Sequence, residues 1–328
     1  MKSMLRHALI ALTMWVALIA FLAAPAIGGP VRALDTIKFT VGANPGGGYD
    51  QTARSLGKAM TDAGTSKTVQ FENKGGAGGT IALAQFVGTA KGDASALIVT
   101  GAVMVGAIVQ SKPPVALAQA TPIARLFYEY NVFVVPANSP LKSMKDVIDL
   151  LKKDAGSVKW GGGSRGSVDH ISIAQLAKLS GVDPATINYV PFQGGGEASA
   201  AILGGHVTVG TSGWNEMAPY IKRGDVRALA VTSAARLPGE NVPTLKELGI
   251  ALEVGNWRGV YGAPGLSAKQ RATLIEAVVN ATQQKSWIDT LAKNDWFAAL
   301  LTGDDFGKFV EDEHKRLEAA MRAVGLVR

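Results

Sequence analysis

The chain has 328 residues, enough for two domains, and 47% of them are hydrophobic, which excludes wholesale disorder. It has no cysteine and four histidines without metal-ligand spacing, so disulfides, thiolate catalysis and a zinc or iron site are not expected. The net charge of +7 is only weak evidence for an anionic partner, and no block of Lys and Arg alternates with aromatic residues, so we expect no nucleic acid.

The N-terminal segment predicts export. Lys2 and Arg6 precede an apolar run over 8–24, and small residues follow at Ala24-Pro25-Ala26 and Val31-Arg32-Ala33. This order is typical of a secretory signal peptide, here within 1–33 and cleaved after residue 26 or 33. The alternative is a permanent membrane anchor that tethers a sensor module. The apolar run of 17 residues is shorter than the roughly 20 that span a bilayer, which favours the signal peptide.

After residue 33, short apolar runs alternate with segments of helical period. Apolar residues recur at i, i+3, i+4 and i+7 in 53–60 and 144–151, and a longer apolar stripe covers 306–324. This alternation predicts an α/β fold with mostly parallel sheets. The expected strands are 37–41, 69–71, 97–100, 132–135, 188–192, 207–211, 228–232 and 257–261.

Two extended segments look like crossings between lobes. They are 130–136 and 254–264, and both end in sequences rich in proline and small residues. A chain that leaves the first lobe at one and returns at the other gives a discontinuous lobe 1 of 34–131 plus 259–328 and a lobe 2 of 132–258. Such a two-strand hinge suits closure around a ligand.

Four glycine-rich loops are the strongest local signal. Each follows a strand candidate, which for the third loop is 158–160, and precedes a helical segment, and they occupy 44–50, 73–80, 161–167 and 193–197. Glycine lets a ligand approach the backbone, and the N–H groups at the start of the next helix attract anions. Any one loop is readily explained as a tight connection. Four in one chain favour a cleft that binds an anion.

Other motifs compete with this interpretation. No loop contains G-K-[ST], and the second loop, with Gly-Gly-Ala-Gly-Gly-Thr at 75–80, lacks the G-x-G-x-x-G spacing of dinucleotide sites, so no nucleotide cofactor is expected. Gly162-Gly163-Ser164-Arg165-Gly166 matches G-x-S-x-G, which leaves a secreted serine hydrolase using Ser164 as the alternative function. Its base would be His206, a weak candidate, or His314, on a solvated helix face. His170 falls in the first turn of a helix, lining or bracing the cleft.

Across these motifs the chain resembles the substrate-binding proteins of the tripartite tricarboxylate transporters, the Bug-type receptors. The resemblance runs from about Ile37 to the C-terminus. The Gly-Gly-Gly-Tyr-Asp form of the first loop and Arg258-Gly259-Val260-Tyr261 are similar to the citrate-binding branch. The segments that carry it are 45–50, 72–79, 135–140, 189–197, 228–233 and 242–244.

The resemblance implies a function and a site. It implies two α/β lobes around a cleft, like type II periplasmic binding proteins, and a non-enzymatic receptor in the periplasm without a cofactor. The ligand would be a small carboxylate, a tricarboxylate such as citrate or a dicarboxylate, held by backbone amides and waters. We expect a monomer that delivers it to membrane permease subunits.

Carried onto this sequence, the family's ligand-binding positions come from both lobes. Arg165 has no firm counterpart in the family, so its role as a second carboxylate clamp is a hypothesis of lower weight. The positions are Gly47, Gly48, Tyr49, Gly78, Gly79, Ser164, Arg165, Ser167, His170, Gly195, Gly196, Glu197, Ser212 and Trp214.

Overall fold

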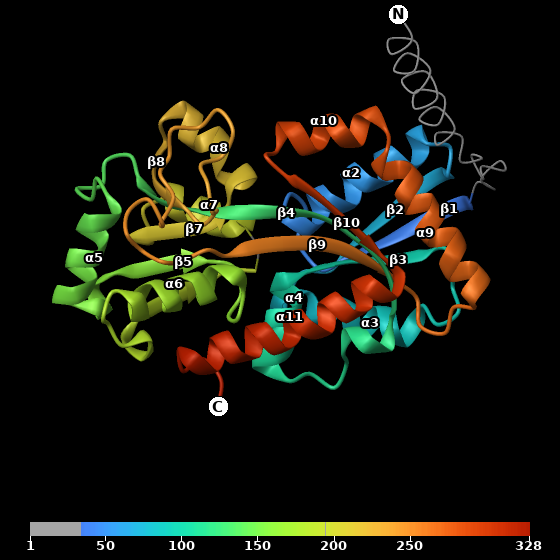
Figure 1. Cartoon of the computed structure of the whole chain (residues 1–328), viewed down its shortest axis with the longest axis horizontal. Coiled ribbons are helices and arrows are strands. Elements are labelled where there is room, and N and C mark those ends of the chain that lie inside the picture. The colour runs from blue at the N-terminus through green and yellow to red at the C-terminus, as the bar shows by residue number, and fades with distance from the viewer. Residues whose placement is uncertain (1–33, 194) are drawn as a thin grey trace, which may run out of the picture. The chain divides into compact units, whose positions relative to one another are not determined.

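The computed structural model describes residues 34–193 and 195–328 (Figure 1). The predicted signal peptide, with both of its cleavage sites, lies outside these described residues. Within them, no helix is both long enough and apolar enough to cross a membrane.

The described residues alternate between strands and helices, as the hydrophobic pattern predicts. The strands are β1 (Leu34–Val41), β2 (Ser66–Asn73), β3 (Ala96–Gly101), β4 (Thr121–Pro136), β5 (Lys159–Gly162), β6 (Asn188–Pro191), β7 (Val209–Gly213), β8 (Val226–Val231), β9 (Gly255–Gly262) and β10 (Phe297–Thr302). The helices are α2 (Gly48–Asp62), α3 (Thr80–Thr89), α4 (Ala102–Ser111), α5 (Met144–Lys153), α6 (Val168–Leu179), α7 (Gly195–Leu203), α8 (Trp214–Arg223), α9 (Ala268–Thr282), α10 (Lys285–Lys293) and α11 (Gly303–Ala323), with short 3-10 turns that include η1 (Ala77–Gly79) and η2 (Leu117–Gln119).

The sheet is mixed, so the prediction of mostly parallel sheets is wrong. Its main path runs β2-β1-β3-β9-β4-β7-β5-β6, with β8 and β10 also paired to β4. Four of the pairings among described strands are parallel, between β1 and its neighbours and between β5 and its neighbours. The five that involve β4 or β9 are antiparallel. Long apolar strands look the same in sequence whichever direction they run, which explains the error.

Strand β4 joins two halves of the sheet. Its residues from Thr121 to Tyr130 pair with β9 and partly with β10, whereas Asn131 to Pro136 pair with β7 and β8. The chain comes back at β9, which pairs with β3 and with the first part of β4. The change of pairing partners in β4 and the return of the chain at β9 fall in the two predicted crossing segments, 130–136 and 254–264. The lobe boundaries themselves remain a prediction.

Helices cover both faces of the sheet (Figure 1). In the half built on β1 and β3, α2, α9 and α10 lie on one side and α3, α4 and α11 on the other. All six residues of β3 are buried, as expected for a strand covered on both faces. The apolar stripe of α11 is buried through Phe306, Val310, Leu317 and Met321, which confirms the helical period read from the sequence.

One strand was predicted only in part and another was missed. β5 was expected only as 158–160, because it contains two glycines in four residues, which weakens its strand signal. β10 lies at the side of β4 with half-exposed or exposed residues throughout, so it lacks the buried run by which the other strands are detected.

Candidate functional site

Two helices begin at the same small cavity without a side-chain cap. The N-cap residues of α2 and α8 are Gly47 and Gly213, and neither helix start receives a capping hydrogen bond from a side chain. Uncapped N–H groups and the positive end of the helix dipole favour a bound anion. The cavity measures about 60 Å³, several times the space one water needs. Its lining residues are Gly42, Ala43, Gly47, Gly48, Tyr49, Gly78, Val103, Gly163, Ser164, Ser167, Asp169, Gln193, Ser212, Gly213, Glu216, Asn256 and Arg258.

Gly48 is packed against a cation at the start of α2. A Cβ atom at this position would lie 2.7 Å from Nη2 of Arg258, closer than real Cβ contacts allow. The next residue, Tyr49, places its ring 4.9 Å from the Arg258 guanidinium, and its hydroxyl accepts a hydrogen bond from Met104 N at 3.0 Å. Burial raises the pKa of Tyr49 to about 12, so its hydroxyl keeps its proton. Only glycine leaves this wall of the cavity open.

The second glycine loop closes another wall. Gly78 has φ +64°, and a Cβ there would meet Ala107 at 2.6 Å and Ser164 Oγ at 3.0 Å. Gly79 has φ +93° and caps α3, but it does not line the cavity. Gly78 thus brings the loop of the first half against the Ser164 loop of the second half.

The carboxylate of Asp169 fixes the loop 161–167 through hydrogen bonds. It accepts one from Gly163 N at 2.6 Å and another from the Asn131 side-chain amide. The hydroxyl of Tyr189 donates to Gly163 O at 2.6 Å. Burial raises the pKa of Asp169 to about 6, and the Glu216 carboxylate contributes to that rise. This network positions the backbone beside Ser164.

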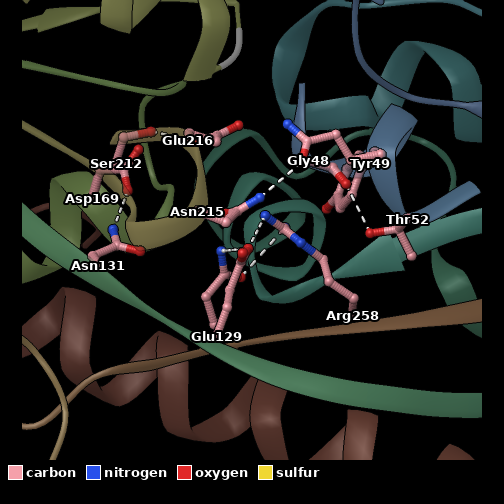
Figure 2. A network of polar contacts seen from close by, with 12 residues as sticks. Gly48, Tyr49, Thr52, Glu129, Asn131, Asp169, Ser212, Asn215, Glu216 and Arg258 are labelled. Carbon is pink, nitrogen blue, oxygen red and sulfur yellow. Dashed lines mark hydrogen bonds and ion pairs between the residues drawn. The ribbon is translucent and has the colours of Figure 1, made fainter. Parts of the chain in front are cut away.

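At the start of α8, two side chains pair across one turn. Ser212 Oγ donates a hydrogen bond to a carboxylate oxygen of Glu216 at 2.5 Å, and both residues line the cavity. Figure 2 shows Asp169, Ser212 and Glu216 gathered on one side, with Gly48 and Tyr49 on the other.

The floor of the cavity contains a buried ion pair. Arg258 on β9 pairs with Glu129 on β4, and Asn256 donates to Glu129 Oε1 at 3.1 Å (Figure 2). Arg258 is only 6% exposed, yet its Nε has no hydrogen-bond partner among the described residues. Removal of both charges from water is costly unless partners compensate, so this pair depends on its geometry.

The structure brings seven of the predicted site residues to the cavity and places six others elsewhere. Those that line it are Gly47, Gly48, Tyr49, Gly78, Ser164, Ser167 and Ser212. Those that do not are Gly79, Arg165, His170, Gly196, Glu197 and Trp214, whereas the prediction for Gly195 is not tested.

His170 supports the Ser164 loop from inside. Its ring stacks on Tyr189 at 4.2 Å between centroids, and its Nδ1 accepts a hydrogen bond from Gly166 N at 3.1 Å. Burial lowers the pKa of His170 to about 4, with a smaller contribution from the Arg165 charge, so the ring is neutral at pH 7. Arg165 itself is exposed.

Glu197 and Trp214 connect the two halves near the cavity. Glu197 on α7 accepts a hydrogen bond from Asn44 Nδ2 at 2.7 Å, and Trp214 Nε1 donates to Asp295 at 2.9 Å. Asn215 Nδ2 adds a third contact, to Gln51 Oε1 at 2.8 Å. Gly195 is the first residue of α7, and Gly196 lines a separate hollow together with Gly46.

Sequence reasoning missed the charged residues of the lining. Asp169, Glu216 and Arg258 reach the cavity, but none was among the predicted ligand contacts. Two usable signals existed: Asp169 stands just after the glycine loop 161–167, and an arginine inside an otherwise apolar strand, such as Arg258, must find a buried partner.

Ser164 lacks the partner that a nucleophile needs. Its Oγ is buried without a hydrogen-bond partner in the described residues, and His170 uses Nδ1 to accept from the backbone instead. A serine nucleophile is activated by a base within hydrogen-bond reach. This geometry does not favour the hydrolase alternative.

A larger cavity of about 520 Å³ lies elsewhere, between α4, η2 and α11. Its walls are mainly apolar, including Val105, Ile108, Leu117 and Val310. A polar anion gains little there because apolar walls offer it no hydrogen bonds. Volume alone therefore does not identify the site.

The fold and the site define a solute-binding protein with two lobes. Residues 52–326 match the model of the tripartite tricarboxylate transporter family receptor, and the chain belongs to that family. The resemblance to this receptor family is thereby confirmed.

Relatives and solved structures agree with this assignment. BugT from Bordetella pertussis is 28% identical over 317 residues, covering 93% of this chain and 95% of BugT. The periplasmic binding protein BugD has a TM-score of 0.82 at 22% identity, over 90% of this chain and 99% of BugD. MatC from Rhodopseudomonas palustris, solved with bound malate, has a TM-score of 0.78 at 26% identity, over 88% of this chain and 99% of MatC.

Proposed function

We propose that this chain is a periplasmic receptor that captures a small carboxylate in the 60 Å³ cavity and delivers it to a membrane permease of the tripartite tricarboxylate type. The observation that carries the proposal is the meeting of two uncapped helix starts, α2 and α8, at one cavity. A carboxylate accepts hydrogen bonds from the N–H groups that those helix starts leave unpaired.

The malate bound to MatC supports the ligand class. MatC shares the fold over nearly its whole length and is 26% identical to this chain. Malate is a small dicarboxylate, which agrees in size with a cavity that has room for several waters.

Main-chain donors can supply much of the required free energy. A hydrogen bond to a charged group contributes about 1.5–3 kcal/mol, so four contribute roughly 6–12 kcal/mol. Loss of translational and rotational freedom costs about 4–15 kcal/mol. Micromolar binding, near −8 kcal/mol, therefore requires side-chain contacts in addition to the amides.

Contacts across the cavity support closure of two lobes around the ligand. Asn44 meets Glu197, Gln51 meets Asn215, and Asp295 meets Trp214, and each pair joins the two halves of the sheet. The hinge would be the two crossings, in β4 and at the start of β9. Closure excludes water and strengthens every electrostatic contact inside. As part of the proposal, the receptor acts as an exported monomer.

A ligand screen tests the proposal. The mature chain is incubated with a library of mono-, di- and tricarboxylates, thermal shifts are recorded, and hits are titrated by calorimetry. We expect at least one acid to raise the melting temperature in a concentration-dependent way with a one-to-one stoichiometry. An unchanged melting temperature with every acid contradicts the proposal.

A further inference from the structure

The cavity has more acidic than basic side chains around it. Asp169 and Glu216 line it together with Arg258. Beneath them, Glu129 is the ion-pair partner of Arg258. In Figure 2 the carboxylates of Asp169 and Glu216 lie on the side opposite Gly48. When these four side chains are ionised, three negative charges face one positive charge, and a carboxylate that enters the cavity adds a further negative charge.

Asp169 meets this added charge without a cation beside it. Its carboxylate accepts hydrogen bonds from two neutral donors, the Gly163 backbone N–H and the Asn131 side-chain amide. No ion pair joins it to a lysine, arginine or histidine of the described residues. Asp169 is only 9% exposed, so salt and bulk water screen its charge weakly.

The titratable groups facing Asp169 from neighbouring elements add to the imbalance. Glu216 on α8 and Glu129 on β4 are acidic. Arg258 on β9 is the cation among them, and Glu129 already pairs with it. The hydroxyl of Tyr189 on β6 keeps its proton, because burial raises its pKa. None of these groups supplies Asp169 with a free counter-charge.

The loop side of Asp169 offers no counter-charge either. His170, the next residue on α6, is buried and neutral at pH 7, and Arg165 is exposed to solvent. Burial, with the charge of Glu216 adding to it, raises the pKa of Asp169 to about 6. The carboxylate is therefore ionised at pH 7.5, but one more negative charge nearby favours its protonated form.

Asn131 can pair with Asp169 in either protonation state. Its Nδ2 donates to the carboxylate, and its Oδ1 is buried without a hydrogen-bond partner among the described residues. A protonated carboxyl group needs an acceptor for its O–H. Half a turn of the Asn131 amide exchanges its two ends and presents Oδ1 as that acceptor. The cavity wall thus has a place for a proton on Asp169.

We propose that binding of a small mono- or dicarboxylate in this cavity takes up one proton, which forms an O–H bond with the carboxylate of Asp169. The proton comes from a buffer acid in solution, which keeps the electron pair, so nothing is oxidised or reduced. This inference rests on the proposed function and concerns its regulation by pH. Because protons are taken up on binding, affinity for the acid rises as pH falls.

Calorimetry counts the proton directly. The mature chain is titrated at pH 7.0 with propionate, malate and succinate, each in PIPES, MOPS and imidazole, whose ionisation enthalpies differ. These acids are themselves ionised at pH 7.0, so a binding enthalpy that varies with the buffer reports protons taken up by the protein. We expect uptake of about 0.5 proton or more per bound acid, and an affinity about fivefold or more higher at pH 6.5 than at pH 8.5.

Asp169→Asn assigns the proton to its residue. The substituted amide is neutral at every pH, and the rotated amide of Asn131 can still pair with it. Proton uptake should fall nearly to zero, and the pH dependence of affinity should flatten. Asp305→Asn changes an exposed aspartate in the first turn of α11 and is the matched control, which should keep both.

A second measurement on the wild type serves if Asp169→Asn melts early. An infrared difference spectrum is recorded with the tightest of the three acids, with and without ¹³C in its carboxylates. A protonated-carboxyl band that the label does not shift places the proton on the protein, whereas a band that shifts places it on the acid and contradicts the proposal.

The possible failures are distinguishable. Binding of an acid without proton uptake overturns this inference and leaves the carboxylate receptor standing, as does uptake that Asp169→Asn retains. Failure of all three acids to bind also overturns it, and failure of every acid in the broader screen overturns the proposed function as well.

Discussion

The two sides of the cavity are built from different chemistry. The side at α2 and η1 offers backbone and glycines, with Gly48 and Gly78 packed so closely that a Cβ would collide with a neighbour. The side at α6 and α8 offers side chains, chiefly Asp169, Ser212 and Glu216. Backbone donors recognise a carboxylate of any acid, whereas charged side chains distinguish one acid from another. Under the proposed function, the first side would hold the carboxylate and the second would distinguish one acid from another.

Gly48→Leu should reduce ligand affinity more than the other variants, because it blocks the backbone side of the cavity. The new side chain starts 2.7 Å from Arg258 Nη2 and fills the space at the N-terminus of α2. We expect calorimetry to show at least a hundredfold loss of affinity for whichever acid binds the wild type. Gly88→Leu is the matched control, because Gly88 lies on exposed α3 surface and a Cβ there meets nothing within 4 Å. Equal affinity in Gly48→Leu would place the ligand elsewhere.

Glu129→Gln should test the ion pair in the floor of the cavity, which lies beneath both sides. It leaves Arg258 as an uncompensated buried cation, which typically costs about 3–5 kcal/mol of folding free energy. Urea unfolding measures the loss. The double variant Glu129→Gln/Arg258→Met removes both charges and should recover most of it. A double variant no more stable than the single one would contradict the assignment of this pair.

His170→Asn tests how His170, which supports the loop that carries Ser164, contributes to the pH dependence of stability. Burial lowers the pKa of His170 to about 4, below its unfolded value near 6.5, so the unfolded chain binds the extra proton between these values. The wild type therefore loses stability as pH falls through that window, by roughly 2–3 kcal/mol from this residue between pH 7.5 and 4.5. Asparagine can still accept from Gly166 but does not titrate. Urea unfolding at the two pH values gives the fall in unfolding free energy, and this fall should be smaller in the variant by roughly 2–3 kcal/mol. An identical fall in both proteins would exclude His170 as its source.

Glu197→Ala should have the smallest effect, because it removes an exposed contact between the halves. The lost hydrogen bond to Asn44 contributes about 0.5–1.5 kcal/mol, so affinity should fall between twofold and tenfold. Glu197→Gln keeps an acceptor and should lose less. If alanine and glutamine variants bind like the wild type, this contact has no part in closure.

Sequence patterns predicted the backbone side better than the side-chain side. The glycine motifs marked the loops, because glycine lets a ligand approach the backbone. The family resemblance then named Gly47, Gly48 and Gly78, which line the cavity, and Gly79, which does not. Asp169 and Glu216 occupy ordinary helical positions, and only the packing of α6 beside α8 and β4 brings them together. The expected strands were found wherever they were buried and apolar, whereas strand direction and β10 depended on pairing that sequence does not encode locally.

His170 and Glu197 illustrate the same limit. Both stand next to glycine loops, and both were expected to contact the ligand. One is turned inward to stack on Tyr189, and the other reaches across to Asn44. A loop position can be read from sequence, but the direction of its side chain is settled by tertiary contacts.

A ligand-bound crystal structure tests the central claim most directly. After the screen identifies an acid, its position can be seen without any assumption about affinity. The account predicts a carboxylate within hydrogen-bond distance of the Gly48 backbone at the start of α2, with the rest of the molecule between Tyr49 and Glu216. A ligand seated instead in the apolar cavity between α4 and α11, with the space at Gly48 holding only water, would contradict it.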